Sequence, residues 1–208
     1  MTEPTGLVAI LRGVRPDEIL AVGGALIAAG FTAIEIPLNS PDPFDSIERL
    51  AAAAPEGCAI GAGTVLSVDD VVRAESAGAR IMVSPNANPE VIAAAAQRGL
   101  RPYPGVATPT EAFSAVDAGA RSLKLFPSDA VGISGMKAWR AVLPAEVEML
   151  PVGGVDETNL ADWIAAGADG AGLGSNLYRP GDDAADVGRR ARTLQDIWSR
   201  AQAERNPR

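Results

Sequence analysis

Apolar and polar positions along the chain follow one recurring pattern: an alanine-rich stretch, a glycine, and then a short run of apolar residues. In residues 117–126, for example, Asp-Ala-Gly-Ala-Arg is followed by Ser-Leu-Lys-Leu-Phe. A glycine just past a helix supplies the left-handed backbone conformation that ends the helix at little steric cost. The pattern therefore predicts helices that each lead through a glycine into a buried strand. These glycines are Gly30, Gly78, Gly99, Gly119 and Gly167.

Two of the gaps between these glycines are about twice as long as the others, which indicates a further unit inside each long gap. The apolar runs at residues 58–62 and 147–152 are the expected missing strands, and residues 7–11 provide a first strand. Eight strand–helix units in about 200 residues predict an α/β fold, a single (β/α)₈ TIM barrel near its lower size limit. We expect residues 1–208 to form one domain.

An open, doubly wound sheet is the alternative fold class. Such a sheet usually carries a glycine-rich turn after its first strand, whereas the turn here reads Arg-Gly-Val-Arg over residues 12–15. Capping residues followed by proline or acidic residues predict where the helices begin. The expected helix starts are Pro16, Ser67, Asn88, Thr108 and Asp156, with a last helix within about 183–203.

The composition supports a parallel sheet and limits the partners. Hydrophobic residues make up 47% of the chain but aromatic residues only 4%, so small aliphatic side chains must fill the core, as in strands covered on both faces. The net charge of −8 argues against nucleic acid, because phosphate backbones are bound by clustered Lys and Arg. No apolar run approaches the roughly 20 residues that span a bilayer, and no signal peptide is visible before the first strand. We expect a cytoplasmic protein with no membrane partner.

Histidine is missing from the chain, and Cys58 is its one cysteine. Zinc sites, iron sites with two histidines, and Ser-His-Asp or Cys-His catalysis therefore lack their usual residues. No intrachain disulfide can form. A magnesium ion held by carboxylates stays open as an alternative. Acid–base chemistry must fall to Glu, Asp, Lys, Tyr or water.

Lys124 stands out because it lies between two leucines in the sixth predicted strand, and the chain has one other lysine, Lys137. Alternation along the strand places Ser122, Lys124 and Phe126 on one face and the leucines on the other. Leucines that pack outward against helices would aim Lys124 into the barrel. Apolar surroundings lower the pKa of a lysine, and a neutral amine can attack a carbonyl carbon. The alternative is a lysine buried in an ion pair.

Glu35 is the second unusual residue, since it ends the second predicted strand between two isoleucines. The same alternation points it inward with Ala33. A carboxyl group in such a place can have a raised pKa and transfer protons during a reaction. The alternative is that Glu35 only balances the charge of a buried lysine.

Two glycine-rich turns follow the seventh and eighth predicted strands, where barrels commonly bind phosphate. Bare glycine backbone lets N–H groups approach phosphate oxygens closely. Two further polar residues, Arg12 and Thr64, fall at the same end of the barrel, and an arginine can bind a carboxylate through two parallel hydrogen bonds. Pro85, Pro104 and Phe126 are candidates for an apolar wall. The alternatives are that the glycines serve only packing and that Arg12 and Thr64 are loop residues with local bonds. The candidate phosphate ligands are Gly153, Gly154, Gly174 and Ser175.

Five motifs in order resemble the class I aldolases that act on 2-keto-3-deoxy-6-phosphogluconate (KDPG), its galactonate epimer (KDPGal) and 4-hydroxy-2-oxoglutarate (KHG). The resemblance runs from about residue 7 to about residue 200. The galactonate branch looks closer, because the gluconate branch usually carries an arginine where this chain has Asn39. The motifs are Glu35-Ile-Pro-Leu-Asn-Ser-Pro41, Gly61-Ala-Gly-Thr-Val65, Leu123-Lys-Leu-Phe-Pro127, Pro151-Val-Gly-Gly154 and Gly172-Leu-Gly-Ser175.

The resemblance implies reversible cleavage of 2-dehydro-3-deoxy-6-phospho-D-galactonate to pyruvate and D-glyceraldehyde 3-phosphate. Lys124 would form an imine with C2, and Glu35 would move protons, through a water. Arg12 and Thr64 would orient the pyruvate end of the substrate, with Asn39 beside it. The resemblance also implies a homotrimer that needs no metal and no cofactor.

Three other functions stay open from the sequence. The same chemistry on KDPG or KHG differs at one stereocentre or in the phosphate. A phosphosugar isomerase or epimerase barrel is the second, although such barrels use histidines or metal ligands and this chain has no histidine. A non-catalytic barrel that binds phosphosugars is the third, because a fold does not by itself determine a function.

Overall fold

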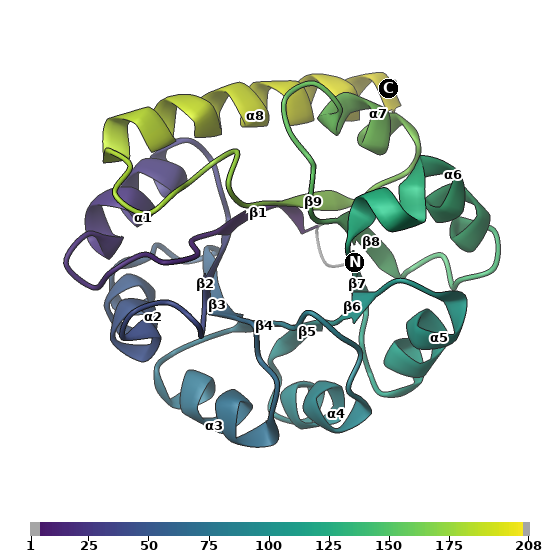
Figure 1. Cartoon of the computed structure of the whole chain (residues 1–208), viewed down its shortest axis with the longest axis horizontal. Helices are drawn as coiled ribbons and strands as arrows, with labels where there is room; N and C mark the ends of the chain where they lie inside the picture. Colours follow the sequence, from purple (N-terminus) through teal and green to yellow (C-terminus); the bar gives the residue numbers. More distant parts are fainter. Residues whose placement is uncertain (1–4, 206–208) are drawn as a thin grey trace.

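The computed structural model describes residues 5–205, in which strands and helices alternate around a ring (Figure 1). Residues 1–4 and 206–208 lie outside the described part. The two ends of the predicted domain, and most of the N-terminal residues in which no signal peptide is expected, therefore lie outside it as well. The strands are β1 (Gly6–Ile10), β2 (Ala33–Pro37), β3 (Ala59–Gly63), β4 (Ile81–Val83), β5 (Arg101–Tyr103), β6 (Gly105–Val106), β7 (Ser122–Leu125), β8 (Glu148–Pro151) and β9 (Gly170–Leu173). The helices are α1 (Ile19–Ala28), α2 (Pro43–Ala53), α3 (Val68–Ser76), α4 (Pro89–Gln97), α5 (Pro109–Asp117), α6 (Ser128–Arg140), α7 (Leu160–Ala165) and α8 (Ala184–Arg205).

The strands pair in parallel in two hydrogen-bonded groups, β5-β4-β3-β2-β1-β9 and β6-β7-β8. The chain itself joins them at Pro104, and a bridge between Val152 and Gly172 joins them on the other side. The predicted (β/α)₈ barrel is confirmed, with its fifth strand divided into β5 and β6. The division falls at Pro104 because proline has no N–H group to donate to a neighbouring strand.

The glycines that mark the repeat end helices as expected. All five have a positive φ, between 73° and 112°, which is the left-handed region that favours glycine. Each lets the chain turn directly from the end of a helix toward the next strand. The repeat seen in the sequence is therefore the strand–helix unit of the barrel.

Three of the expected helix starts are confirmed by side-chain caps. Ser67 and Thr108 each form a capping box with the residue three positions on, and Asn88 accepts a hydrogen bond from the amide of Glu90. The last helix, α8, also agrees with its expected range.

The other two starts were placed three to four residues too early, because α1 begins at Ile19 and α7 at Leu160. The polar residues before these helices close turns instead. Asp156 accepts hydrogen bonds from the amide and the hydroxyl of Thr158, and Glu18 accepts one from the amide of Arg15.

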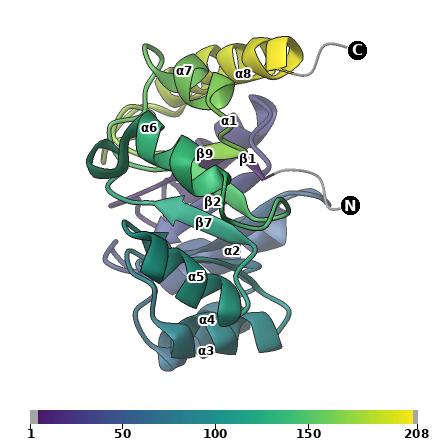
Figure 2. The same ribbon diagram turned by 90° about the vertical axis from the view of Figure 1, so that its right-hand side faces the viewer.

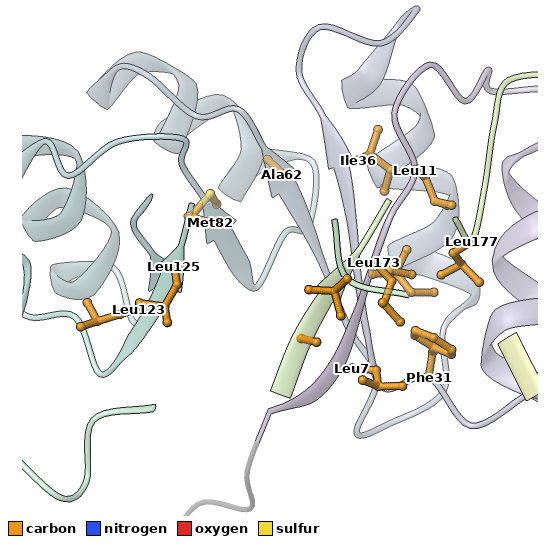
Figure 3. Close-up of a cluster of buried hydrophobic side chains, with 14 of the residues drawn as sticks. Leu7, Leu11, Phe31, Ile36, Ala62, Met82, Leu123, Leu125, Leu173 and Leu177 are labelled. Atoms are coloured by element: carbon orange, nitrogen blue, oxygen red, sulfur yellow. The ribbon is translucent and has the colours of Figure 1, made fainter. Parts of the chain in front are cut away.

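The main core lies between the outer face of the ring and the helices (Figure 3). Leu7, Leu123, Leu125 and Leu173 point outward from their strands into it, and Leu11 joins them from the turn after β1. The side view shows α3, α4 and α5 along one side of the ring and α7 and α8 along the opposite side (Figure 2). A smaller apolar cluster fills the inside of the ring. Its buried members are Val8, Ala33, Ile81, Val83, Tyr103 and Leu150.

Among the described helices, none combines the length and the apolar character that crossing a membrane requires.

Candidate active site

Lys124 points into the ring, as the alternation along its strand predicts. Leu123 and Leu125 on either side of it are fully buried in the core under the helices, while Lys124 lines a cavity inside the barrel. We call this cavity the inner chamber. Its lining residues are Val8, Ile10, Glu35, Val83, Tyr103, Lys124, Leu150, Val152 and Gly172.

The inner chamber brings the two candidate catalytic residues together. Glu35 on β2 is 1% exposed and Lys124 on β7 is 7% exposed, and the other lining residues are apolar apart from the hydroxyl of Tyr103. An amine and a carboxyl group therefore share one small space that is largely closed to solvent, where charged forms are penalised and charge–charge interactions are strong.

Burial lowers the pKa of Lys124, and the nearby positive charge of Arg12 lowers it further, whereas the carboxylate of Glu35 raises it. The net direction is downward. The Nζ atom also lies 4.6 Å from the centre of the Phe126 ring, which can stabilise the ammonium form. The balance keeps a neutral amine accessible closer to physiological pH than for an exposed lysine.

Burial raises the pKa of Glu35 to about 7, against the opposing effects of Lys124 and Arg12. Its Oε2 atom is buried and has no hydrogen-bond partner among the described residues. A carboxyl group with a pKa near 7 can both accept and donate a proton at neutral pH. The environment of Glu35 is thus suited to an acid–base role as well as to balancing charge.

The carboxylate of Glu35 occupies space left by a glycine. A Cβ atom at Gly63 would lie 1.6 Å from Oε2. Only glycine at position 63 leaves the carboxylate where it is.

Arg12 lies at the mouth of the barrel, in the turn after β1. Its Nη1 atom donates a hydrogen bond of 2.6 Å to Oδ1 of Asn39, and the amide of Gly13 donates one of 2.9 Å to Oγ of Ser40. These two hydrogen bonds from the turn after β2 therefore fix the position of the turn after β1, to which Arg12 belongs. Asn39 accepts a hydrogen bond from one nitrogen of the Arg12 guanidinium, so the other N–H donors of Arg12 can bind a ligand.

Thr64, the first residue after β3, has a φ of +57°. A β-branched residue in the left-handed region is strained and persists only where its surroundings fix it, which is often at a functional site. The side chain is half-buried, at the same end of the barrel as Arg12.

The glycine turns after β8 and β9 are held by side chains that bind their carbonyl groups. Ser128 donates to the carbonyl of Gly153, and Asn159 donates to that of Gly154 at 2.8 Å. Within residues 5–205, no hydrogen bond to protein uses the amide N–H of Gly153, Gly154, Gly174 or Ser175. The C=O and N–H groups of one peptide unit point in opposite directions. Because Ser128 and Asn159 bind the carbonyl groups of the turn after β8, the N–H groups of the same peptides point away from them, which suits the binding of an anion.

A second hollow at the mouth joins the turns after β1 and β9. Arg12, Gly174 and Ser175 share its lining with Tyr178 and Arg179. Arg12 is thus placed to interact with an anion bound by the turn after β9 as well as with a group deeper in the barrel.

Pro85 is one candidate that the described chamber does not include. It lies half-buried beyond β4, and its carbonyl group packs against the space where Gly105 has no side chain. Phe126 is not among the lining residues of the chamber either, but its ring is close to both Lys124 and Gly153.

Several residues that position the site had no signal of their own in the sequence. They are Ser40, Gly63, Tyr103, Ser128 and Asn159. Ser40 and Gly63 lie within the quoted motifs, but the sequence does not show which group each of the five residues contacts. In residues 5–205, no group of three or more His, Cys, Asp or Glu side chains is close enough to hold a metal ion.

Comparison with known proteins identifies the family. A family model described as KDPG and KHG aldolase matches residues 2–189. The chain belongs to this family. As a KDPG and KHG aldolase, it is 57% identical over 185 residues to the probable 2-dehydro-3-deoxy-6-phosphogalactonate aldolase of Rhizobium meliloti (strain 1021), which covers 89% of this chain and 87% of that protein.

This aldolase is also 52% identical over 175 residues to the 2-dehydro-3-deoxy-6-phosphogalactonate aldolase of Escherichia coli (strain K12), covering 84% of this chain and 85% of that protein. The solved structure described as native KDPGal matches with a TM-score of 0.94 and 46% sequence identity, and covers 97% of this chain and 98% of that one. The resemblance seen in the motifs is confirmed over most of the chain.

Proposed function

We propose that this aldolase reversibly cleaves 2-dehydro-3-deoxy-6-phospho-D-galactonate to pyruvate and D-glyceraldehyde 3-phosphate. The names of the two relatives above 50% identity support this substrate over its gluconate epimer. The observation that carries the chemistry is the pairing of a buried Lys124, whose pKa is lowered, with a buried Glu35, whose pKa is raised to about 7, in one chamber.

The proposed reaction begins when the neutral amine of Lys124 attacks the C2 carbonyl group of the substrate. The carbinolamine that forms loses water to give a protonated imine. Glu35 then takes the proton of the C4 hydroxyl, directly or through a water, as the C3–C4 bond breaks and its electrons move into the imine. The aldehyde leaves, C3 of the resulting enamine takes up a proton, and water releases pyruvate and restores the amine.

The remaining candidates orient the two ends of the substrate. Arg12 and Thr64 are proposed to bind the pyruvate end, with Asn39 holding the guanidinium of Arg12. The free N–H groups of the turns after β8 and β9 are proposed to bind the phosphate, together with the hydroxyl of Ser175. An acidic protein attracts an anion weakly from a distance, so these local dipoles must supply the affinity.

Trapping of the imine tests the role of Lys124. Incubation with pyruvate and cyanoborohydride should add one reduced pyruvate to the peptide that contains residue 124. The chain offers a matched control, because Lys137 lies on α6, away from the chamber. We expect Lys137→Arg to be labelled like the wild type and Lys124→Arg to be unlabelled and inactive. A labelled Lys124→Arg, or bound pyruvate without any label, would contradict the mechanism.

The substrate is tested by comparing the two epimers. Cleavage of each at equal concentration is followed through the pyruvate released, and we expect the galactonate epimer to have the higher kcat/KM. Preference for the gluconate epimer, or for KHG, would assign one of the alternative substrates with the same chemistry. Binding of phosphosugars without cleavage would identify a non-catalytic barrel.

We also propose that the protein is a cytoplasmic homotrimer. The family resemblance supports the trimer, and exposed apolar side chains gather where α3 begins. Leu66, Val68 and Val72 are 52%, 40% and 36% exposed, and Val68 and Val72 share one helix face. Light scattering after size-exclusion chromatography should give three times the monomer mass. Val68→Asp places a charge in this surface and should lower that mass, and an unchanged mass would rule the surface out as the interface.

A further inference from the structure

Tyr103 separates the inner chamber from a different hollow, at the end of the barrel opposite to the mouth. This amino-end hollow is lined by residues at the starts of the strands, among them Thr5, Arg80 and Arg101. Tyr103 is the one residue that lines both spaces. Its side chain is 3% exposed, whereas Thr32, Gly57 and Arg80 around the amino-end hollow are open to solvent.

Two neighbours fix the ring of Tyr103. The guanidinium of Arg101 lies 5.3 Å from the ring centre, and the phenolic oxygen is 2.9 Å from Oγ1 of Thr5. The Thr5 hydroxyl gives its own proton to Oε2 of Glu148 at 2.6 Å, so Tyr103 is the donor in its bond to Thr5. Burial raises the pKa of Tyr103, and the phenol keeps the proton that this bond requires.

Glu148 connects these neighbours into one network. It accepts hydrogen bonds from the amide of Thr5 at 3.2 Å, from Arg101 at 2.6 Å and from Ser122 at 2.9 Å. Arg101 also donates to Ser122 at 3.2 Å. We call Thr5, Arg101, Tyr103, Ser122 and Glu148 the floor network. Its members come from β5, β7, β8 and the residue before β1, so it ties together strands from both hydrogen-bonded groups.

The floor network lies directly behind the candidate nucleophile. Ser122 and Lys124 point inward from the same strand, two residues apart, as do Arg101 and Tyr103. On the chamber side, the charged groups that act on Lys124 are Glu35 from β2 and Arg12 from the turn after β1. Arg101 and Glu148 are paired with each other on the far side of the Tyr103 ring.

We infer that Tyr103 is a positioning residue for the aldolase reaction, which closes the inner chamber against water from the amino end and so keeps Lys124 dehydrated. The inference rests on the proposed role of Lys124. An amine in a dry chamber loses its proton more readily than one in contact with water, so the floor sets how much of Lys124 is neutral at a given pH. The network acts through the ring, which it holds across the opening.

The test measures how the rate of imine formation depends on pH. Wild type, Tyr103→Ala and Tyr103→Phe are incubated with pyruvate and cyanoborohydride at a series of pH values, and the trapped product is followed by mass spectrometry. Tyr103→Ala admits water and should move the rising limb of the profile about one pH unit upward, which is about a tenfold slower reaction on that limb. Tyr103→Phe keeps the ring and should restore most of the wild-type profile.

Leu123→Ala is the matched structural control, because it removes a large buried side chain next to Lys124 but on the outer face of the same strand. It should lower the Tm and leave the pH of the rising limb unchanged. Should Tyr103→Ala fail to fold, Thr5→Val keeps the ring but removes the hydroxyl that links the phenol to Glu148, and it should shift the limb in the same direction by less.

The outcomes separate the two hypotheses. A wild type that traps pyruvate, with the same pH profile in Tyr103→Ala or in Thr5→Val, would overturn the role of the floor alone. A wild type that binds pyruvate but traps none would overturn the role of Lys124 and the inference that rests on it.

Discussion

Gly63 has no side chain, and the carboxylate of Glu35 occupies the space that a side chain would fill. A Cβ atom at position 63 would fall 1.6 Å from Oε2 of Glu35, far inside van der Waals contact. Within residues 5–205, this Oε2 atom has no hydrogen-bond partner that would hold it in place. Any side chain at position 63 must therefore turn Glu35 away from its present position.

We predict that Gly63→Ala leaves a folded barrel with little aldolase activity. Displacement of a catalytic group by about 1 Å can reduce the rate about 100-fold, so we expect kcat/KM to fall by about that factor or more. Steady-state assays of pyruvate release measure the loss, and circular dichroism checks the fold.

Gly24→Ala is the control for this change, since Gly24 lies on α1 with open space around its Cβ position. It should keep full activity and stabilise the helix by about 0.5–1 kcal/mol. Wild-type kcat/KM in Gly63→Ala would show that the position of the carboxylate does not limit the reaction.

The raised pKa of Glu35 predicts a cost in stability at neutral and alkaline pH. Between the ordinary pKa of 4.5 and the folded value of about 7, the folded protein holds a proton that the unfolded chain has lost. Stability therefore falls as the pH rises through this window and stays reduced above it. Glu35→Gln does not titrate, so its Tm relative to wild type should rise from pH 4.5 to pH 7 and then level off.

Thermal unfolding followed by circular dichroism at pH 4.5 to 8 measures this difference. Parallel Tm curves for wild type and Glu35→Gln would mean that the carboxyl group titrates alike in the folded and unfolded states.

Sequence could predict the direction of Lys124 and Glu35 because alternation along a strand fixes which side chains point inward. It could not predict the roles of Gly63 or Tyr103. A glycine in a sequence indicates backbone freedom, whereas Gly63 leaves room for the side chain of Glu35 on the neighbouring strand. The Tyr103 ring is held in part by Thr5, and the two residues lie 98 positions apart in the sequence.

At the scale of elements, α5 begins with a reciprocal cap between Thr108 and Glu111. Glu111 also accepts a hydrogen bond from the amide of Ala107, and these bonds lower its pKa. The cap fixes the point at which the chain leaves β6 and enters α5, one strand before Lys124.

We predict that Thr108→Ala destabilises the protein by about 1 kcal/mol, the usual loss for an N-cap. Urea denaturation at equilibrium measures the change. Ser76→Ala is the comparison, since its hydroxyl only bonds the carbonyl of Val72 within α3, and should change stability by less than about 0.5 kcal/mol. Equal effects of the two changes would show that the cap contributes nothing specific.

Helix starts were predicted correctly where the capping residue bonds the first turn, and wrongly where it closes a separate turn. Asp156 has the residue type of a cap, but its partner is Thr158 and the helix follows later. The strands after the repeat glycines were predictable because the left-handed glycine fixes where each helix stops. The division of the fifth strand at Pro104 could not be predicted, because a proline interrupts a strand only where its missing N–H group would have paired with a neighbouring strand.

At the scale of the whole molecule, we propose that the chain unfolds as one domain. The strands β1 and β9 are neighbours, so the two ends of the sequence stabilise each other. Tryptophan residues report on one side of the ring, because Trp139, Trp163 and Trp198 all lie on α6, α7 and α8. Circular dichroism reports on all the helices.

We predict that tryptophan fluorescence and circular dichroism give the same midpoint in urea, with one transition. A fluorescence midpoint at lower urea than the circular dichroism midpoint would mean that the α6–α8 side unfolds separately, and the domain would then divide near the junction at Pro104.

The pairing of β1 with β9 has a consequence for synthesis on the ribosome. Strands β1 to β5 emerge in the order in which they pair, but one edge of β1 stays open until residues 170–173 have emerged. An open strand edge is a template for other chains. The nascent aldolase therefore exposes the unpaired edge of β1 during most of its translation. A truncated chain that ends before β9 leaves this edge unpaired and open to pairing with other chains.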